Sequence, residues 1–96
     1  MIYATHKLYD CQHRVTTYRV VETKDGIVAE VYNFECEKHS MQWYDAIVLS
    51  SKNIIDCYFT AFSDILECLD CNDKNTPLYA YGVTYDFDGV LLSRLK

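Results

Sequence analysis

Cysteine and histidine residues form three closely spaced pairs, and these side chains are common zinc ligands. The pairs are Cys11-x-His13, Cys36-x-x-His39 and Cys68-x-x-Cys71. Zinc takes four such donors in a tetrahedral arrangement. One hypothesis is therefore a zinc-stabilised structural domain whose metal ligands are Cys36, His39, Cys68 and Cys71. The alternative, which we favour, is that the cysteines are small buried apolar residues.

The same residues give little support for catalysis. A Cys-x-x-Cys motif is redox-active when a helix N-terminus favours its thiolate, whereas Cys68 and Cys71 fall near the C-terminal end of a predicted helix, beside acids. No spacing selects one cysteine and one histidine as nucleophile and base. The sequence has no glycine-rich phosphate loop and no Gly-x-Ser-x-Gly motif. We therefore predict no catalytic residues, no cofactor and no enzyme activity.

The sharpest local motif lies at residues 83–91, where an apolar strand runs into Asp86-x-Asp88-Gly89. It resembles the first motif of the haloacid-dehalogenase phosphatases. The resemblance implies a small enzyme in which Asp86 is the nucleophile and Asp88 the general acid/base, both near Mg²⁺. Only seven residues follow Gly89, which leaves no room for the later motifs of that family. A strand that ends in an Asp-Gly hairpin turn has the same residue pattern, and we favour that interpretation.

A long helix over residues 50–72 is the main element that the sequence predicts. Its apolar residues recur at steps of three and four and form one broad arc. They are Ile54, Ile55, Tyr58, Ala61, Phe62, Ile65, Leu66 and Leu69. Asn53 is a suitable N-cap, and Asn72 can end the helix. We place partner binding on the opposite, polar arc and the loop after it, at Asp56, Ser63, Asp64, Glu67, Asp70 and Asp73.

Short strands are predicted on both sides of this helix. They cover residues 2–9, 14–22, 27–36, 41–49, 78–87 and 90–95. Asp25-Gly26 and Asp88-Gly89 indicate two hairpins. For the first hairpin we predict a four-residue loop, residues 23–26, which sets Arg19 opposite Glu30. The element order is β-β-β-β-α-β-β, an α+β fold in which an antiparallel sheet of about five to six strands packs against one central helix.

Residues 78–87 alternate between large and small side chains. Tyr79, Tyr81, Val83, Tyr85 and Phe87 share one face of the predicted strand. We expect this face to be the core, because large apolar side chains are usually buried. In the alternative arrangement the small face meets the helix and the rings face outward. Tyr79, Tyr81 and Tyr85 are therefore also candidate partner-binding residues.

Composition and charge indicate one compact domain, residues 1–96, that binds a basic partner. Half of the residues are hydrophobic, the formal net charge is −5, and residues 53–73 hold five acids but no Lys or Arg. Direct nucleic-acid binding is disfavoured, because it needs a positive surface. We expect neither a membrane span nor a signal peptide. The odd count of five cysteines then favours reduced thiols and a cytoplasmic location.

The function that we predict is a protein–protein interaction module, an inhibitor or regulator that occludes a larger partner. Its aromatic residues would anchor the partner, and its acids would steer association. Acids along one helix face could also imitate phosphates, as in a virus-encoded inhibitor of a host nucleic-acid-handling enzyme, acting in the host cytoplasm. Association between copies of this chain, through a sheet edge or the aromatic face, is left open by the sequence.

Overall fold

The computed structural model describes residues 1–10, 14–36, 40–51, 57–68, 77–86 and 89–96. Within these residues the chain forms seven strands and one short helix. In chain order they are β1 (Ile2–Tyr9), β2 (Val15–Lys24), β3 (Ile27–Asn33), β4 (Gln42–Ser50), β5 (Cys57–Phe59), α1 (Phe62–Cys68), β6 (Tyr79–Asp86) and β7 (Gly89–Arg94). No helix among the described residues is long and apolar enough to cross a membrane.

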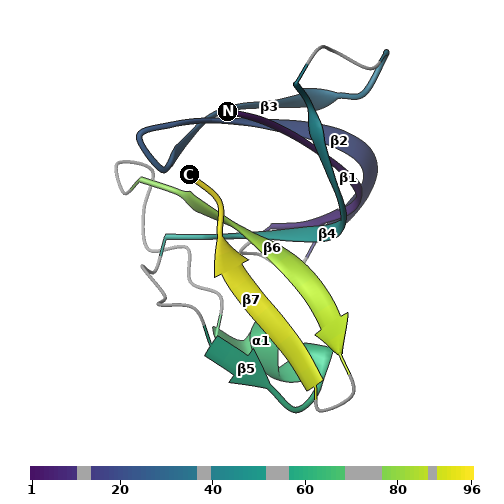
Figure 1. The fold of residues 1–96 in the computed structure, drawn as a ribbon, viewed down its shortest axis with the longest axis vertical. Helices are drawn as coiled ribbons and strands as arrows, with labels where there is room; N and C mark the ends of the chain where they lie inside the picture. Colours follow the sequence, from purple (N-terminus) through teal and green to yellow (C-terminus); the bar gives the residue numbers. More distant parts are fainter. Residues whose placement is uncertain (11–13, 37–39, 52–56, 69–76, 87–88) are drawn as a thin grey trace.

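All of these strands belong to one sheet, in the order β3-β2-β1-β4-β6-β7-β5. β1 and β4 are parallel, and the other neighbouring strands pair antiparallel. Figure 1 shows α1 and β5 together at one end of the molecule, far from the β2–β3 hairpin. The prediction of an antiparallel sheet is confirmed in part: the sheet is mostly antiparallel, but β1 and β4 are parallel, and it has seven strands where five to six were predicted. The prediction of one central helix packed across that sheet is wrong.

The predicted helix over residues 50–72 fails because part of it pairs with a distant strand. Tyr58 lies opposite Leu91, and Phe59 lies opposite Val90 on β7. Gly89 permits this close approach, because a Cβ at that position would collide with the main-chain oxygen of Phe59. α1 therefore begins only at Phe62 and spans seven residues. The helical spacing of the apolar residues is real, but tertiary pairing overrides local preference here.

β4 lies in the middle of the sheet, and its second half, residues 46–50, is buried on both faces. Ala46 and Val48 point into one hydrophobic cluster, and Ile47 and Leu49 point into another. A strand that is covered on both sides needs a continuous apolar run in place of strict alternation. This requirement explains the run AIVL at residues 46–49.

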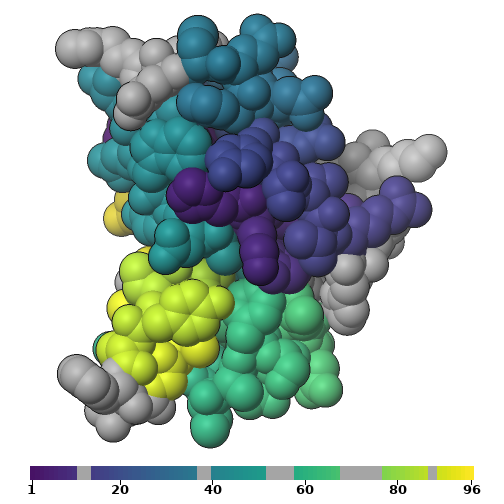
Figure 2. Space-filling view, turned by 90° about the vertical axis from the view of Figure 1, so that its right-hand side faces the viewer, coloured from purple at the N-terminus to yellow at the C-terminus, as the bar shows by residue number. Residues whose placement is uncertain are grey.

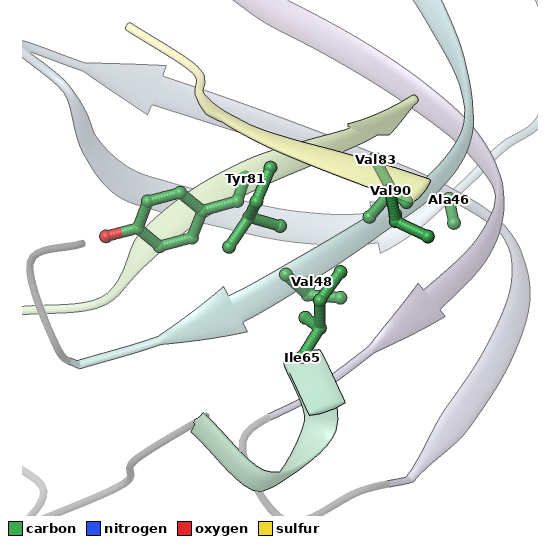
Figure 3. Close-up of a cluster of buried hydrophobic side chains, with 7 residues drawn as sticks. Ala46, Val48, Ile65, Tyr81, Val83 and Val90 are labelled. Carbon is green, nitrogen blue, oxygen red and sulfur yellow. The ribbon is translucent and has the colours of Figure 1, made fainter. Parts of the chain in front are cut away.

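The first cluster fills the space between the sheet and α1. Figure 3 shows Ile65 reaching from α1 toward Val48, with Tyr81, Val83, Val90 and Ala46 around them. Ile65 is fully buried, and half-buried Phe62 and Leu66 pack against the same cluster. The short helix thus covers one end of one sheet face.

The second cluster is enclosed because the sheet curls back on itself. At the tip of the β2–β3 hairpin, the Val28 amide donates a hydrogen bond to the Leu78 carbonyl at 2.9 Å, just before β6. Nη2 of Arg94 on β7 donates to the Gly26 carbonyl at 3.3 Å. The buried residues inside this curl are Tyr3, Leu8, Val21, Ile47, Leu49, Ala80 and Leu95.

The β2–β3 hairpin is confirmed, but its predicted register is wrong. The turn has two residues, Asp25 and Gly26, both at positive φ, with Lys24 opposite Ile27. A shift in register between Glu22 and Thr23 then sets Glu22 opposite Glu30 and Arg19 opposite Asn33. A regular two-residue turn would set Val21 opposite Glu30, whereas the bulge sets Val21 opposite an apolar residue, Val31.

The β6–β7 hairpin is also confirmed. Both faces of β6 carry buried residues. Tyr81 and Val83 are buried, as the aromatic-core prediction requires, but Tyr85 on the same predicted face is 59% exposed. The opposite face is covered as well, since Ala80 is buried in the second cluster and Gly82 is also buried. Phe87 lies outside the described residues.

Candidate functional site

The predicted acidic surface is only partly described by the structure. Ser63, Asp64 and Glu67 are exposed on α1. Asp56, Asp70 and Asp73 lie outside the described residues. The premise of one long acidic helix face does not hold, because the chain is a strand at residues 57–59 and a helix only from Phe62.

The predicted tyrosines do not form one surface. Tyr81 is fully buried, so it has no surface to offer a partner. Tyr79 is half-buried and packs against the first cluster, and the guanidinium of Arg94 lies over its ring, 4.3 Å from the centroid. Tyr85 is exposed, and of the three it alone presents most of its ring to solvent.

The zinc hypothesis falls mostly on residues that the structure does not describe. Cys36 is exposed and free, shortly after β3. His39 and Cys71 lie outside the described residues, and of Cys68 only the helical main chain is described. Among the described side chains, no three His, Cys, Asp or Glu residues gather as a metal site would require.

Asp86 of the phosphatase-like motif has a turn-forming contact. Its Oδ1 accepts a hydrogen bond from the Gly89 amide at 3.0 Å, and Asp86 and Gly89 form the last pair of the β6–β7 ladder. This contact is the local side-chain bond typical of Asp in turns. Asp88 lies outside the described residues.

Four exposed or half-buried rings pack together on the outer face of the sheet, and we call them the aromatic surface. They are His6, Tyr18, Phe34 and Trp43. Trp43 is central: its ring centroid lies 5.1 Å from that of His6 and 4.9 Å from that of Phe34, the latter edge-on. His6 also meets Tyr18 edge-on, with centroids 5.5 Å apart. Tilted and edge-on contacts at these distances are the favourable arrangements of aromatic rings.

Strand register brings these rings together. Ala4 lies opposite Val20 on one side and opposite Trp43 on the other. Residues two apart along a strand share a face, which places His6 and Tyr18 beside that row. Past the end of β3, the Phe34 amide donates to the Tyr18 carbonyl at 2.9 Å, and this bond holds the fourth ring in place.

The aromatic surface has a small-residue floor and an exposed rim. Ala4 and Val20 are almost completely buried beneath it, whereas Trp43 and Tyr18 remain 36% and 55% exposed. Beside it lies a hollow of about 320 Å³ lined by Val20, Tyr32, Asn33, Glu35 and Cys36. Exposed apolar patches with a polar rim are typical of protein interaction sites.

None of these four residues was predicted to be part of a binding site. The available signals were the single Trp of the chain and the alternation around it in MQWYD. They became informative only with the strand order, because β1 and β4 are neighbours although more than thirty residues separate them.

No protein-family model, no curated protein and no solved structure matches this chain.

Proposed function

We propose that this protein is an interaction module that binds and occludes a larger protein, with the aromatic surface as its anchor. The observation that carries the proposal is the packing of Trp43 with His6 and Phe34, and of His6 with Tyr18, on an exposed face of the sheet. These rings are held by neighbouring strands of one sheet, so little side-chain freedom remains to be lost on binding.

The energetics of interfaces support this choice of anchor. Aromatic residues are enriched at the centres of protein interfaces. A few buried Trp, Tyr or Arg side chains supply most of the binding free energy, about 2 kcal/mol or more each when truncated to Ala. Trp43 is the strongest candidate for such an anchor, since it contacts two other rings and is still 36% exposed.

The charge of the chain supports a basic partner. The formal net charge is −5, and Asp64 and Glu67 are exposed on α1. Complementary charge speeds encounter and selects partners more than it raises affinity. More specifically, these acids would occupy the positions of phosphates at a nucleic-acid-binding surface of the partner.

The experiment is affinity capture from a lysate of the cells in which the protein is naturally made, washed at low and at high salt, with mass spectrometry of the retained proteins. We expect one larger protein that remains at high salt, because an aromatic anchor is not screened by ions. Loss of that protein at high salt would assign binding to the acids.

Sedimentation of the protein alone tests whether the aromatic surface instead binds a second copy of this chain. A stable dimer that Trp43→Ser dissociates would show that it does.

A further inference from the structure

A second hollow adjoins the aromatic surface where β4 and β6 separate. The pairing of these strands ends at Ala46–Val83. Beyond that pair, β4 continues beside β1 and β6 continues beside β7. The groove between them has a volume of about 380 Å³ and is lined by Trp43, Tyr44, Asp45, Val83, Thr84 and Tyr85. In Figure 2 the teal surface of β4 meets the yellow-green surface of β6 on one face of the molecule.

The groove has aromatic walls and one carboxylate. Trp43 and Tyr44 come from β4, and Tyr85 comes from β6. Aliphatic Val83, which is only 2% exposed, also lines the groove. Asp45 is exposed, and none of the described residues that line the groove is a Lys or Arg. Its negative charge is therefore not neutralised by a cation in the lining.

We propose that this groove binds the guanidinium group of an arginine side chain. Aromatic faces attract cations. A guanidinium group combines a flat surface that stacks on rings with a fork of N–H donors that matches a carboxylate. Arginine is thus the ordinary side chain that suits Trp43, Tyr85 and Asp45 at once. The source of the arginine, a basic partner protein, rests on the proposed function. The chemistry of the groove does not.

Two observations within the molecule agree with this assignment. The guanidinium of Arg94 already lies over the ring of Tyr79 at 4.3 Å, so a tyrosine face of this sheet accepts an arginine. The pKa of Tyr85 is raised, first by burial and then by the charges of Tyr9 and Asp45. Of these causes only the negative charge of Asp45 also favours a positive ligand, because burial disfavours a charge of either sign.

The test uses the single tryptophan of the chain as a reporter in the groove. N-acetyl-arginine methylamide is titrated against the protein while Trp43 fluorescence is followed, with N-acetyl-citrulline methylamide as the uncharged match of the same shape. We expect a saturable change with the arginine compound and binding of the citrulline compound weaker by about ten-fold, as the loss of a cation–π contact and an ion pair implies. Equal responses to the two compounds would overturn the proposal.

Single substitutions test whether arginine binds in this groove. Asp45→Asn and Tyr85→Leu should each weaken arginine binding by about five-fold or more, with the fold of each variant checked by circular dichroism. Glu30→Gln, at an exposed acid on β3, makes the same change in net charge elsewhere and should leave binding unchanged. A loss of arginine binding in Glu30→Gln equal to that in Asp45→Asn would overturn the proposal, because it would show an effect of overall charge.

If arginine does not bind but Trp43 is still needed to capture a partner, this inference fails and the proposed function stands. If arginine binds and no partner is captured, this inference stands and the proposed function fails.

Discussion

The ring of Tyr44 lies directly against Gly82: a Cβ on Gly82 would come within 2.5 Å of Cε1 of that ring. Gly82 is on β6 and pairs with Ile47, three residues beyond Tyr44 on β4. The missing side chain lets Tyr44 pack against β6 near the point where the strands separate. Tyr44 is packed against the second cluster and also lines the groove. One small residue thus connects the core to the candidate binding region.

Gly82→Ala should destabilise the protein. The added methyl group must displace the Tyr44 ring, and overpacking of this kind costs about 1–3 kcal/mol. Urea unfolding followed by circular dichroism measures the change. Thr84→Ser, at an exposed site on the same strand, is the control and should change the free energy of unfolding by less than about 0.5 kcal/mol. A Gly82→Ala variant as stable as the control would contradict the close contact.

Ile65→Ala should cost about 2–5 kcal/mol, the range for truncating a fully buried aliphatic side chain. Ile65 is fully buried and belongs to the same cluster as Val48 and Tyr81. Glu67→Ala is the matched control, since Glu67 is exposed on the same helix. If the two variants unfold at the same urea concentration, α1 does not pack on the sheet as described.

Stability should fall at high pH, with a contribution from Tyr3. Burial raises the pKa of Tyr3 above 10.0, the neighbouring Tyr44 raises it further, and the hydrogen bond to Lys96 lowers it. The Tyr3 hydroxyl donates that bond to the Lys96 carbonyl at 2.9 Å. The folded protein therefore holds the proton more strongly than the unfolded chain does. This stabilisation is complete below the unfolded pKa of about 10 and is lost as the pH rises through the folded pKa.

Urea unfolding between about pH 8 and pH 11 tests this dependence. Tyr3→Phe should lose about 0.5–1.5 kcal/mol at neutral pH with its hydrogen bond and should show a shallower decline at high pH. Tyr18→Phe, at an exposed tyrosine, is the control and should keep the wild-type slope. A Tyr3→Phe slope equal to that of wild type would mean that Tyr3 makes no such contribution.

Local patterns predicted most of the strands but not their arrangement. Val15–Lys24 and Tyr79–Asp86 were visible because aromatic and β-branched residues run up to Asp-Gly turns. The bulge between Glu22 and Thr23 was not predicted. The strand at Cys57–Phe59 was also missed, because its reason is pairing with β7, far along the chain.

The candidate site depends even more on long-range arrangement. Trp43 meets His6 and Phe34 only because β1 lies between β2 and β4 and is parallel to β4. No local spacing encodes that crossing. The predicted acids were easier to find, because a run of like charges is visible in the sequence, yet charge placement bears on partners and not on the fold.

Replacing acids by amides should reduce the rate of partner association without removing the anchor. In a variant with Asp56→Asn, Asp64→Asn, Glu67→Gln and Asp70→Asn, we expect weaker binding and a flatter dependence on salt. Surface plasmon resonance at several ionic strengths against the captured partner measures both. If the affinity and its dependence on salt are both unchanged, the acids do not contribute to partner binding.

The most direct test compares partner capture by two variants that each lack one exposed aromatic ring. Trp43→Ser removes the centre of the aromatic surface, and Tyr58→Ser removes a ring that is 61% exposed on β5, at the other end of the molecule. We expect Tyr58→Ser to retain the partner. Trp43→Ser, with its fold checked by circular dichroism, should lose about thirty-fold in affinity or more, as expected for an interface anchor. Equal retention by the two variants would contradict the claim that this protein binds through the aromatic surface.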